Sequence, residues 1–235
     1  MEASTSYIRP IIKTSLLLLS AVSVHLSLSP PNPPVKEDES MVWMGVLTEI
    51  MGPALSSVWK RHLSVLSSSQ STPSPLSSSI KHPFQGTSPR DLNACHPLLL
   101  AGAMLTLLAA SLRIWCFKKL GPMFTFEITI RPKHQLVTSG PYSWVRHPSY
   151  TGVYLTLVGA TLLLSAPNTW LSASRVLYTA PGCVFAALWA MKCMLAFRGT
   201  YLRLTTEDQV LRETFGVEWE EYATRVPWRL VPGFF

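Results

Sequence analysis

The chain has 235 residues, of which 48% are hydrophobic and only 14% are charged, and its mean hydropathy is +0.24. This balance argues against a soluble protein and predicts an all-α polytopic membrane protein that buries its apolar side chains in lipid. The net charge of +7 lies beside apolar stretches and forms no basic run, so it indicates membrane topology and not nucleic-acid binding. The four cysteines include no Cys-x-x-Cys pair, so we expect reduced thiols, no disulfide and no metal site.

The first apolar stretch predicts a membrane helix over about 8–28. The prolines of PPNPP at 30–34 end it, because proline lacks the amide donor and clashes with a continuing helix. A cleaved signal peptide is the alternative. Residues 41–59 are either a second crossing or a kinked interfacial helix, so that residues 1–60 form one or two N-terminal membrane segments.

Residues 61–94 are rich in serine and proline and cannot bury enough apolar surface to fold, so we expect a disordered linker. A single C-terminal unit over 95–235 follows. It begins with a membrane helix over 97–117, from whose end Arg113 can snorkel to the membrane surface.

A helical hairpin is predicted next, with arms over 148–174 and 176–197. The dipeptide Pro167-Asn168 marks the turn between the arms, and Pro181-Gly182 is expected to kink the second arm. The prediction for the whole chain is about four to five transmembrane helices.

Charge predicts the orientation. The loop 118–147 holds five lysines and arginines against one acid, Glu127, and the tail after residue 197 is rich in arginine, so both are expected on the cytosolic side. If 8–28 and 41–59 both cross, the N-terminus lies on the lumenal side. If one of them does not cross, it lies in the cytosol.

The run GPYSWVRHPSYTG at 140–152 is the first candidate site. Its Gly-Pro pair marks a turn, and Pro148 suits the first position of a helix that His147 would cap, where free backbone N–H groups favour an anionic ligand. Tyr150 and Tyr154 share a helix face, and the glycine at 152 permits close approach. An interfacial aromatic belt is the alternative, which we prefer for Trp144 alone.

The tail supplies a second cluster. Arg203 and Glu207 are four residues apart and therefore share one helix face, so they could complete a pocket closed by His147. The alternative is a solvated amphipathic helix with intrahelical ion pairs, which we accept for four further residues of the tail. These are Arg212, Glu213, Glu220 and Glu221.

Taken together, these parts resemble the isoprenylcysteine carboxyl methyltransferase family. The resemblance covers roughly 97–230 and is carried by LVTSGPYSWVRHPSYTGVYL, a hydrophobic hairpin, Arg203-x-x-x-Glu207-Asp208, FGVEWEEY and RVP. It implies that 95–235 is the catalytic core of a multi-pass enzyme of the endoplasmic reticulum membrane whose catalytic face is cytosolic. Such enzymes use S-adenosyl-L-methionine to methylate the C-terminal carboxylate of prenylated CaaX proteins.

The resemblance also implies a role for particular residues. Arg203 would face the substrate carboxylate, and ten residues would bind the cofactor. These are His134, Gln135, Leu136, Val137, Tyr142, His147, Pro148, Ser149, Tyr150 and Glu207. Glu127 stands where the family often has glutamine and is a weaker candidate. For His134, a loop-surface position and a metal ligand are open alternatives, the metal being the less favoured.

The implied partners are farnesyl- or geranylgeranyl-cysteine protein C-termini and membrane lipid, with no nucleic acid. A phospholipid N-methyltransferase, which carries a related Arg-His-Pro run, and an inactive membrane paralogue are the alternatives. A carboxylate is already ionised and needs no general base, and the quoted clusters hold no obvious buried base, which mildly favours the carboxylate. We expect the prenyl chain to reach the site from lipid between 97–117 and 148–174. The chain lacks the Gly-x-Gly turn of soluble Rossmann-type enzymes.

Overall fold

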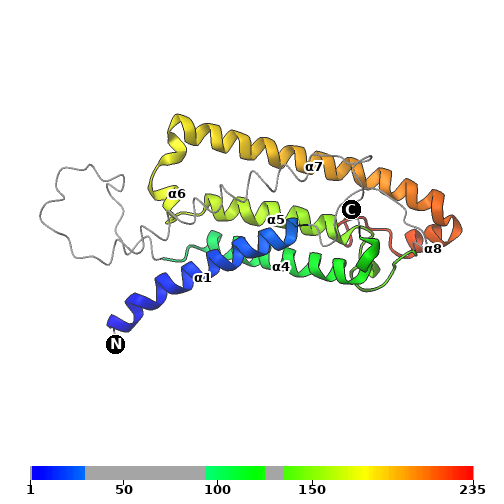
Figure 1. The fold of residues 1–235 in the computed structure, drawn as a ribbon, viewed down its shortest axis with the longest axis horizontal. Coiled ribbons are helices and arrows are strands. Elements are labelled where there is room, and N and C mark those ends of the chain that lie inside the picture. Colours follow the sequence, from blue (N-terminus) through cyan, green and yellow to red (C-terminus); the bar gives the residue numbers. More distant parts are fainter. Residues whose placement is uncertain (1, 30–93, 125–134, 235) are drawn as a thin grey trace, which may run out of the picture.

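The computed structural model describes residues 2–29, 94–124 and 135–234, and this part of the chain is helical, with no strand in it (Figure 1). The all-α prediction is thereby confirmed. The helices are α1 (Glu2–Leu28), α4 (Pro97–Leu120), α5 (Pro148–Ser165), α6 (Trp170–Ala173), α7 (Ala180–Phe215) and α8 (Val217–Arg225). Short 3₁₀ turns lie at Gly121–Met123, Gly140–Ser143 and Val176–Tyr178.

Three of the described helices are long and apolar enough to cross a membrane, over Ile11–Leu28, Pro97–Met123 and Ala180–Phe215. A fourth, α5, has 18 residues and lies between α4 and α7 (Figure 1), which is close to the shortest length that spans a bilayer. The polytopic membrane class is therefore confirmed. The candidate segment at 41–59 and the proposed linker at 61–94 lie outside the described residues.

Helix α5 is antiparallel to the other long helices (Figure 1). Helices α1, α4 and α7 run one way and α5 runs back between them (Figure 1), so the start of α1 lies at the end of the bundle opposite α8. Lys13 pins α1 at that end, since its Nζ donates to the carbonyls of Asn168, at 2.6 Å, and Ala94, at 3.3 Å.

Glycines bring α4 and α5 into close contact. A Cβ atom added at Gly102 would lie 2.8 Å from the carbonyl oxygen of Gly159, and one added at Gly159 would lie 2.9 Å from Cγ2 of Thr106. Small residues commonly bring membrane helices together in this way. At this contact no room remains for a lipid chain, so the expected approach of a prenyl group between these two spans is wrong there.

Arg113 does not snorkel to the surface as expected but is buried, with 2% of its surface exposed. Its guanidinium donates to the Ser27 carbonyl of α1, and its Nη1 lies 3.0 Å from the carbonyl and 2.8 Å from the hydroxyl of Ser149 on α5. These oxygens accept hydrogen bonds from Nε and Nη1 inside the bundle, where a charged group among apolar helices needs internal partners. The predicted close approach at Gly152 occurs here, since an added Cβ would lie 2.5 Å from Cγ of Arg113.

The second arm of the hairpin and the tail form one continuous helix. Thr179 caps the start of α7 by accepting the amide hydrogen of Gly182, and Pro181 lies in the first turn. The expected kink is therefore absent, since proline is tolerated in a first turn. With 36 residues, α7 is about 54 Å long, well beyond the roughly 30 Å of a bilayer core.

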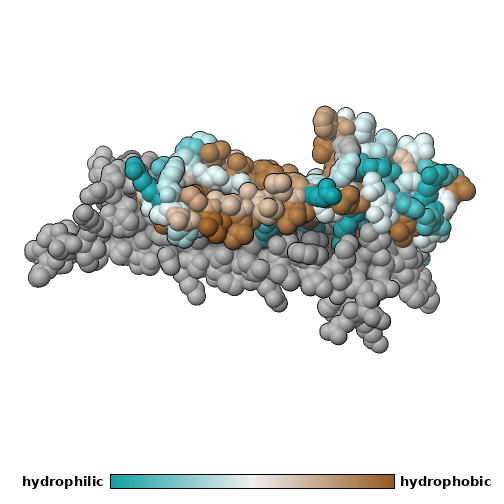
Figure 2. Space-filling model, turned by 90° about the horizontal axis from the view of Figure 1, so that it is seen from above, coloured by the Kyte–Doolittle hydropathy of each residue, from teal (hydrophilic) through white to brown (hydrophobic). Residues whose placement is uncertain are grey.

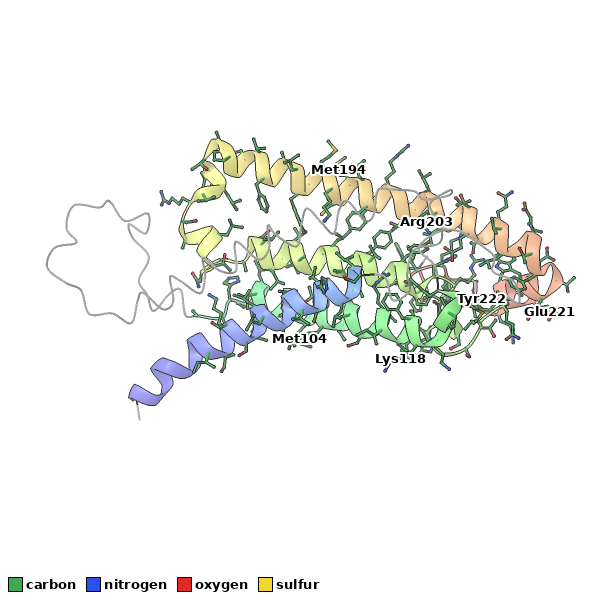
Figure 3. The ribbon with its side chains drawn as sticks, viewed as in Figure 1. Met104, Lys118, Met194, Arg203, Glu221 and Tyr222 are labelled. Atoms are coloured by element: carbon green, nitrogen blue, oxygen red, sulfur yellow. The ribbon has the colours of Figure 1, made fainter. Side chains whose placement is uncertain are left out.

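A hydrophobic band covers α7 between more hydrophilic ends (Figure 2). Met194 of α7 is 66% exposed and points away from α5 (Figure 3). Beyond the band, Gly216 has a φ of 52°, a value that favours glycine, and it reverses the chain into α8. The polar end of α7 and α8 therefore fold back over the start of α5.

Candidate functional site

The C-terminal segment Val226–Leu230, which we call the strap, is bound to the start of α5. The amide groups of Arg146 and His147 donate to the carbonyls of Trp228 and Arg229, each at 2.9 Å. The Thr151 hydroxyl donates to the carbonyl of Leu230 at 2.7 Å. The end of the chain is thus held against the run that the sequence marks as the first candidate site.

Helix α8 holds the preceding loop in place. Trp219 and Tyr222 of α8 form a buried cluster with Val226, and Leu136 packs against it. The Tyr222 hydroxyl donates to the carbonyl of Tyr142 at 2.8 Å (Figure 3). Burial raises the pKa of Tyr222, so its hydroxyl keeps the proton that it donates.

His147 occupies the N-cap position of α5, but its ring does not cap the helix as expected. Its Nε2 lies 2.8 Å from Oδ1 of Asp208 on α7, and both residues are buried. The second oxygen of this carboxylate lies 3.5 Å from Nη2 of Arg146 and 3.2 Å from Nε of Arg229. An aspartate between two guanidinium groups and an imidazole therefore joins α7 to the strap and to the start of α5.

Glu207 lies beside the same ring. Its Oε2 accepts a hydrogen bond of 2.7 Å from the Tyr150 hydroxyl and lies 3.9 Å from Nδ1 of His147. The Glu207 side chain is 34% exposed, so it remains accessible to a ligand. Two clusters that are far apart in the sequence therefore meet at one end of the bundle.

Arg203 lies one turn before Glu207 on α7, where this helix passes the start of α5 (Figure 3). It interacts electrostatically with the Tyr150 hydroxyl. Its Nε is buried and has no hydrogen-bond partner among the residues that the structure describes. A guanidinium N–H without an acceptor beside an accessible carboxylate is typical of a binding site for an anionic group.

The other residues that the resemblance implies are placed differently. The Ser149 hydroxyl bonds to Arg113, and Pro148 is the buried first residue of α5. Tyr142 is buried, and it interacts with the buried Cys116 of α4. These three residues make contacts within the fold, and their roles toward the cofactor stay predictions.

The loop before Tyr142 is described only in part. Gln135 is exposed, Leu136 packs on the α8 cluster and Val137 is half-buried. His134 and Glu127 lie outside the described residues. Within the described ranges, no three or more His, Cys, Asp or Glu side chains lie close enough together to hold a metal ion.

Sequence reasoning missed three residues of the site, namely Asp208, Arg146 and Arg229. Asp208 stands directly after Glu207, so it points to a different side of α7 and reaches the buried face of His147. Arg229 arrives through the strap, whose position no local pattern encodes. The signal that could have found Asp208 was the acidic pair itself, since two adjacent acids on a helix cannot serve the same face.

The structure also describes Trp144 and Arg212, for which the sequence favoured positions outside the site. Trp144 is 58% exposed and makes an edge-to-face contact with Trp115 at 5.4 Å, as an interfacial aromatic pair would. Arg212 and Glu220 are solvent-exposed as the alternative predicts, but their 2.7 Å ion pair joins α7 to α8, so the expected pairing within one helix is wrong for them. Neither pair contributes to the His147 cluster.

An apolar helical bundle with a buried polar cluster at one end defines a polytopic helical membrane protein with a candidate site at its polar end. The sequence model of the isoprenylcysteine carboxyl methyltransferase (ICMT) family matches residues 102–212, a range that includes His147, Tyr150, Arg203, Glu207 and Asp208. The family resemblance is thereby confirmed for these residues.

Named relatives include isoprenylcysteine O-methyltransferases and a protein named for metal resistance. The chain is 31% identical to protein-S-isoprenylcysteine O-methyltransferase B of Arabidopsis thaliana over 54% of this chain and 55% of that protein. It is 34% identical to protein-S-isoprenylcysteine O-methyltransferase of Schizosaccharomyces pombe over 40% of this chain and 32% of that protein. It is also 33% identical to the cobalt-zinc-cadmium resistance protein CzcN of Cupriavidus metallidurans, over 56% of this chain and 48% of that protein.

The chain spans about half the length of the plant relatives that it matches. No solved structure matches it.

Proposed function

We propose that this chain is an S-adenosyl-L-methionine-dependent methyltransferase that methylates the C-terminal carboxylate of a prenylated cysteine. One observation carries the proposal. His147 and Tyr150 from the start of α5 meet Glu207 at the polar end of an apolar bundle, with Arg203 one helical turn away. A site at that place can reach a lipid-linked group from the membrane and a soluble cofactor from water.

The residues present fit the cofactor. S-adenosyl-L-methionine carries an ammonium group, a sulfonium and a carboxylate, and when bound it supplies an activated methyl group. Glu207 would bind the ammonium group, and the ring of Tyr150 would lie against the sulfonium by cation–π attraction. The start of α5 suits the carboxylate less well than expected, because the amides of Tyr150 and Thr151 already donate to the His147 carbonyl.

Arg203 would bind the substrate carboxylate. Its unpartnered Nε can donate to one oxygen and leave the other free to attack the methyl carbon in line with the leaving sulfur. Methyl transfer to this oxygen would form a carbon–oxygen bond and break the carbon–sulfur bond, so that the cofactor would leave as a neutral thioether. No proton is transferred, since the attacking carboxylate is ionised at neutral pH.

The clusters contain a buried base, contrary to the expectation from the sequence. His147 and Asp208 form a buried imidazole–carboxylate pair within the site. Such a pair would assist methylation of an amine, which must lose a proton, and it favours a phospholipid N-methyltransferase as the second candidate. Preference for the carboxylate rests instead on Arg203 and on the family match.

The approach of the prenyl chain is proposed along the α5–α7 side of the bundle. The contacts between α5 and α7 are few and include a stack of Tyr154 on Phe197 at 4.9 Å and a hydrogen bond from Trp189 to Thr161. Much of the apolar surface of α7 is exposed (Figure 2). We further propose an endoplasmic reticulum location with the α8 end in the cytosol, where prenylated proteins and the cofactor are present.

The test uses membranes from cells expressing the full chain, supplied with S-adenosyl-L-methionine that carries a labelled methyl group. The acceptors are N-acetyl-S-farnesylcysteine, its geranylgeranyl counterpart and phosphatidylethanolamine. Base-labile methyl ester on the prenylcysteines is expected, with none on the lipid amine. If phosphatidylethanolamine is labelled and neither prenylcysteine is, the proposal is wrong and the chain is a phospholipid N-methyltransferase. Binding of S-adenosylhomocysteine without transfer to any acceptor would leave a non-catalytic paralogue.

A further inference from the structure

The ion pairs around Asp208 determine which nitrogen of His147 carries a proton. Asp208 lies between the guanidinium groups of Arg146 and Arg229, so it is held as a carboxylate, which only accepts hydrogen bonds. The 2.8 Å contact between this carboxylate and Nε2 therefore requires that Nε2 donates. In the neutral ring the other nitrogen, Nδ1, is then an acceptor.

This acceptor faces a second acceptor. Nδ1 of His147 lies 3.9 Å from Oε2 of Glu207, which is too far for a direct hydrogen bond. Two acceptors at this separation can share one nitrogen donor placed roughly 2.9 Å from each. The nitrogen of an ammonium group carries three N–H donors. Two of them can bond to Nδ1 and Oε2, and the third can bond to solvent or to the cofactor's own carboxylate. The pair of atoms thus suits a primary ammonium group.

We propose that Asp208 is a positioning residue, which holds His147 so that Nδ1 and Glu207 together bind the ammonium group of the cofactor. This inference rests on the cofactor part of the proposed function. It differs from the expectation drawn from the sequence, in which the helix start that His147 would cap favours an anionic ligand. Asp208, which follows Glu207 in the sequence, therefore acts on the cofactor through the His147 ring and not by direct contact.

The strap takes part through Arg229. The carbonyl of Arg229 accepts the amide hydrogen of His147, and its Nε lies 3.2 Å from the Asp208 carboxylate. One strap residue therefore contacts both members of the pair. The geometry explains why a segment at the end of the chain would affect a ligand that it does not touch.

The test is a comparison of two ligands on the full chain in lipid nanodiscs. The ligands are S-adenosylhomocysteine and its analogue that lacks the α-amino group. Asp208→Asn removes the charge that orients the ring, so S-adenosylhomocysteine is expected to bind roughly tenfold more weakly, while affinity for the analogue stays unchanged. Gln209→Ala, a change at the neighbouring exposed position, is the matched control and should alter neither affinity.

A second pair of variants covers the case in which Asp208→Asn fails to fold. Arg229→Gln should weaken the binding of S-adenosylhomocysteine at least threefold and leave the affinity for the analogue unchanged. Arg229→Lys should bind S-adenosylhomocysteine almost as tightly as the unchanged protein. An equal loss of affinity for both ligands would show that Asp208 and Arg229 have a merely structural role, and it would overturn the inference.

The two proposals can fail separately. If the ligand-specific loss is found but no prenylcysteine is methylated, the proposed substrate is wrong and the role of Asp208 stands. If the unchanged chain binds neither ligand, both proposals are overturned.

Discussion

Nε2 of His147 and Oδ1 of Asp208 lie 2.8 Å apart, although 61 residues separate them in the sequence. Between them the chain forms α5, the turn through α6 and most of α7. A contact of this kind fixes how far α7 extends along α5, because sliding by one residue would move the carboxylate by about 1.5 Å and turn it by about 100°. It therefore sets the position of Arg203 and Glu207 as well.

Glu207→Gln is expected to weaken S-adenosylhomocysteine binding by roughly 10- to 100-fold, because a charge-assisted hydrogen bond to the ligand ammonium is lost. Calorimetric titration of the purified protein measures this. Glu213→Gln is the control, since Glu213 is an exposed acid on the same helix that accepts a hydrogen bond from Gln209. Similar affinities for the unchanged protein and the Glu207 variant would remove Glu207 from the cofactor site.

Arg203→Ala should lower turnover by at least tenfold while changing S-adenosylhomocysteine affinity less than threefold, since this guanidinium is assigned to the substrate carboxylate. Initial rates with N-acetyl-S-farnesylcysteine give the comparison. Arg198→Ala provides an exposed arginine on the same helix as the control. A loss of cofactor affinity as large as the loss of turnover would contradict the assignment.

Arg113→Met is expected to destabilise the protein by about 2–4 kcal/mol, because the Ser27 and Ser149 oxygens that it satisfies would be left without this donor inside the bundle. Thermal unfolding in detergent gives the shift. Lys118→Met, at an exposed position of the same helix (Figure 3), should change the midpoint little. Equal midpoints for the two variants would mean that the buried contacts are not stabilising.

Gly102→Ala should also destabilise the protein, by about 1–3 kcal/mol, since its added methyl group would press on the Gly159 carbonyl and force α4 and α5 apart. Gly199→Ala, in open space on α7, should be neutral or stabilise by up to about 1 kcal/mol, because alanine favours a helix. The two unfolding midpoints, measured side by side, decide the matter. A Gly102 variant as stable as the Gly199 variant would contradict the close contact.

Local patterns in the sequence were enough to predict the class and much of the framework. The predicted helix at 97–117 is α4, and Pro148 begins α5 as its missing donor suggests. The predicted arm over 148–174 was too long, because α5 ends at Ser165 and the chain turns at Pro167-Asn168. The meeting of His147 with Glu207 followed from the hairpin between them, since a chain that returns across a membrane brings the two ends of the hairpin together.

Only the tertiary structure decided the remainder. Nothing in the local pattern shows that Arg113 is buried, since a lone arginine near a helix end is equally suited to the surface, and its partners come from two other helices. The local pattern does not show the role of Asp208 either, because its partners His147 and Arg229 come from the start of α5 and from the strap. Periodicity and capping act over a few residues, whereas a buried charge is settled by whichever distant groups can satisfy it.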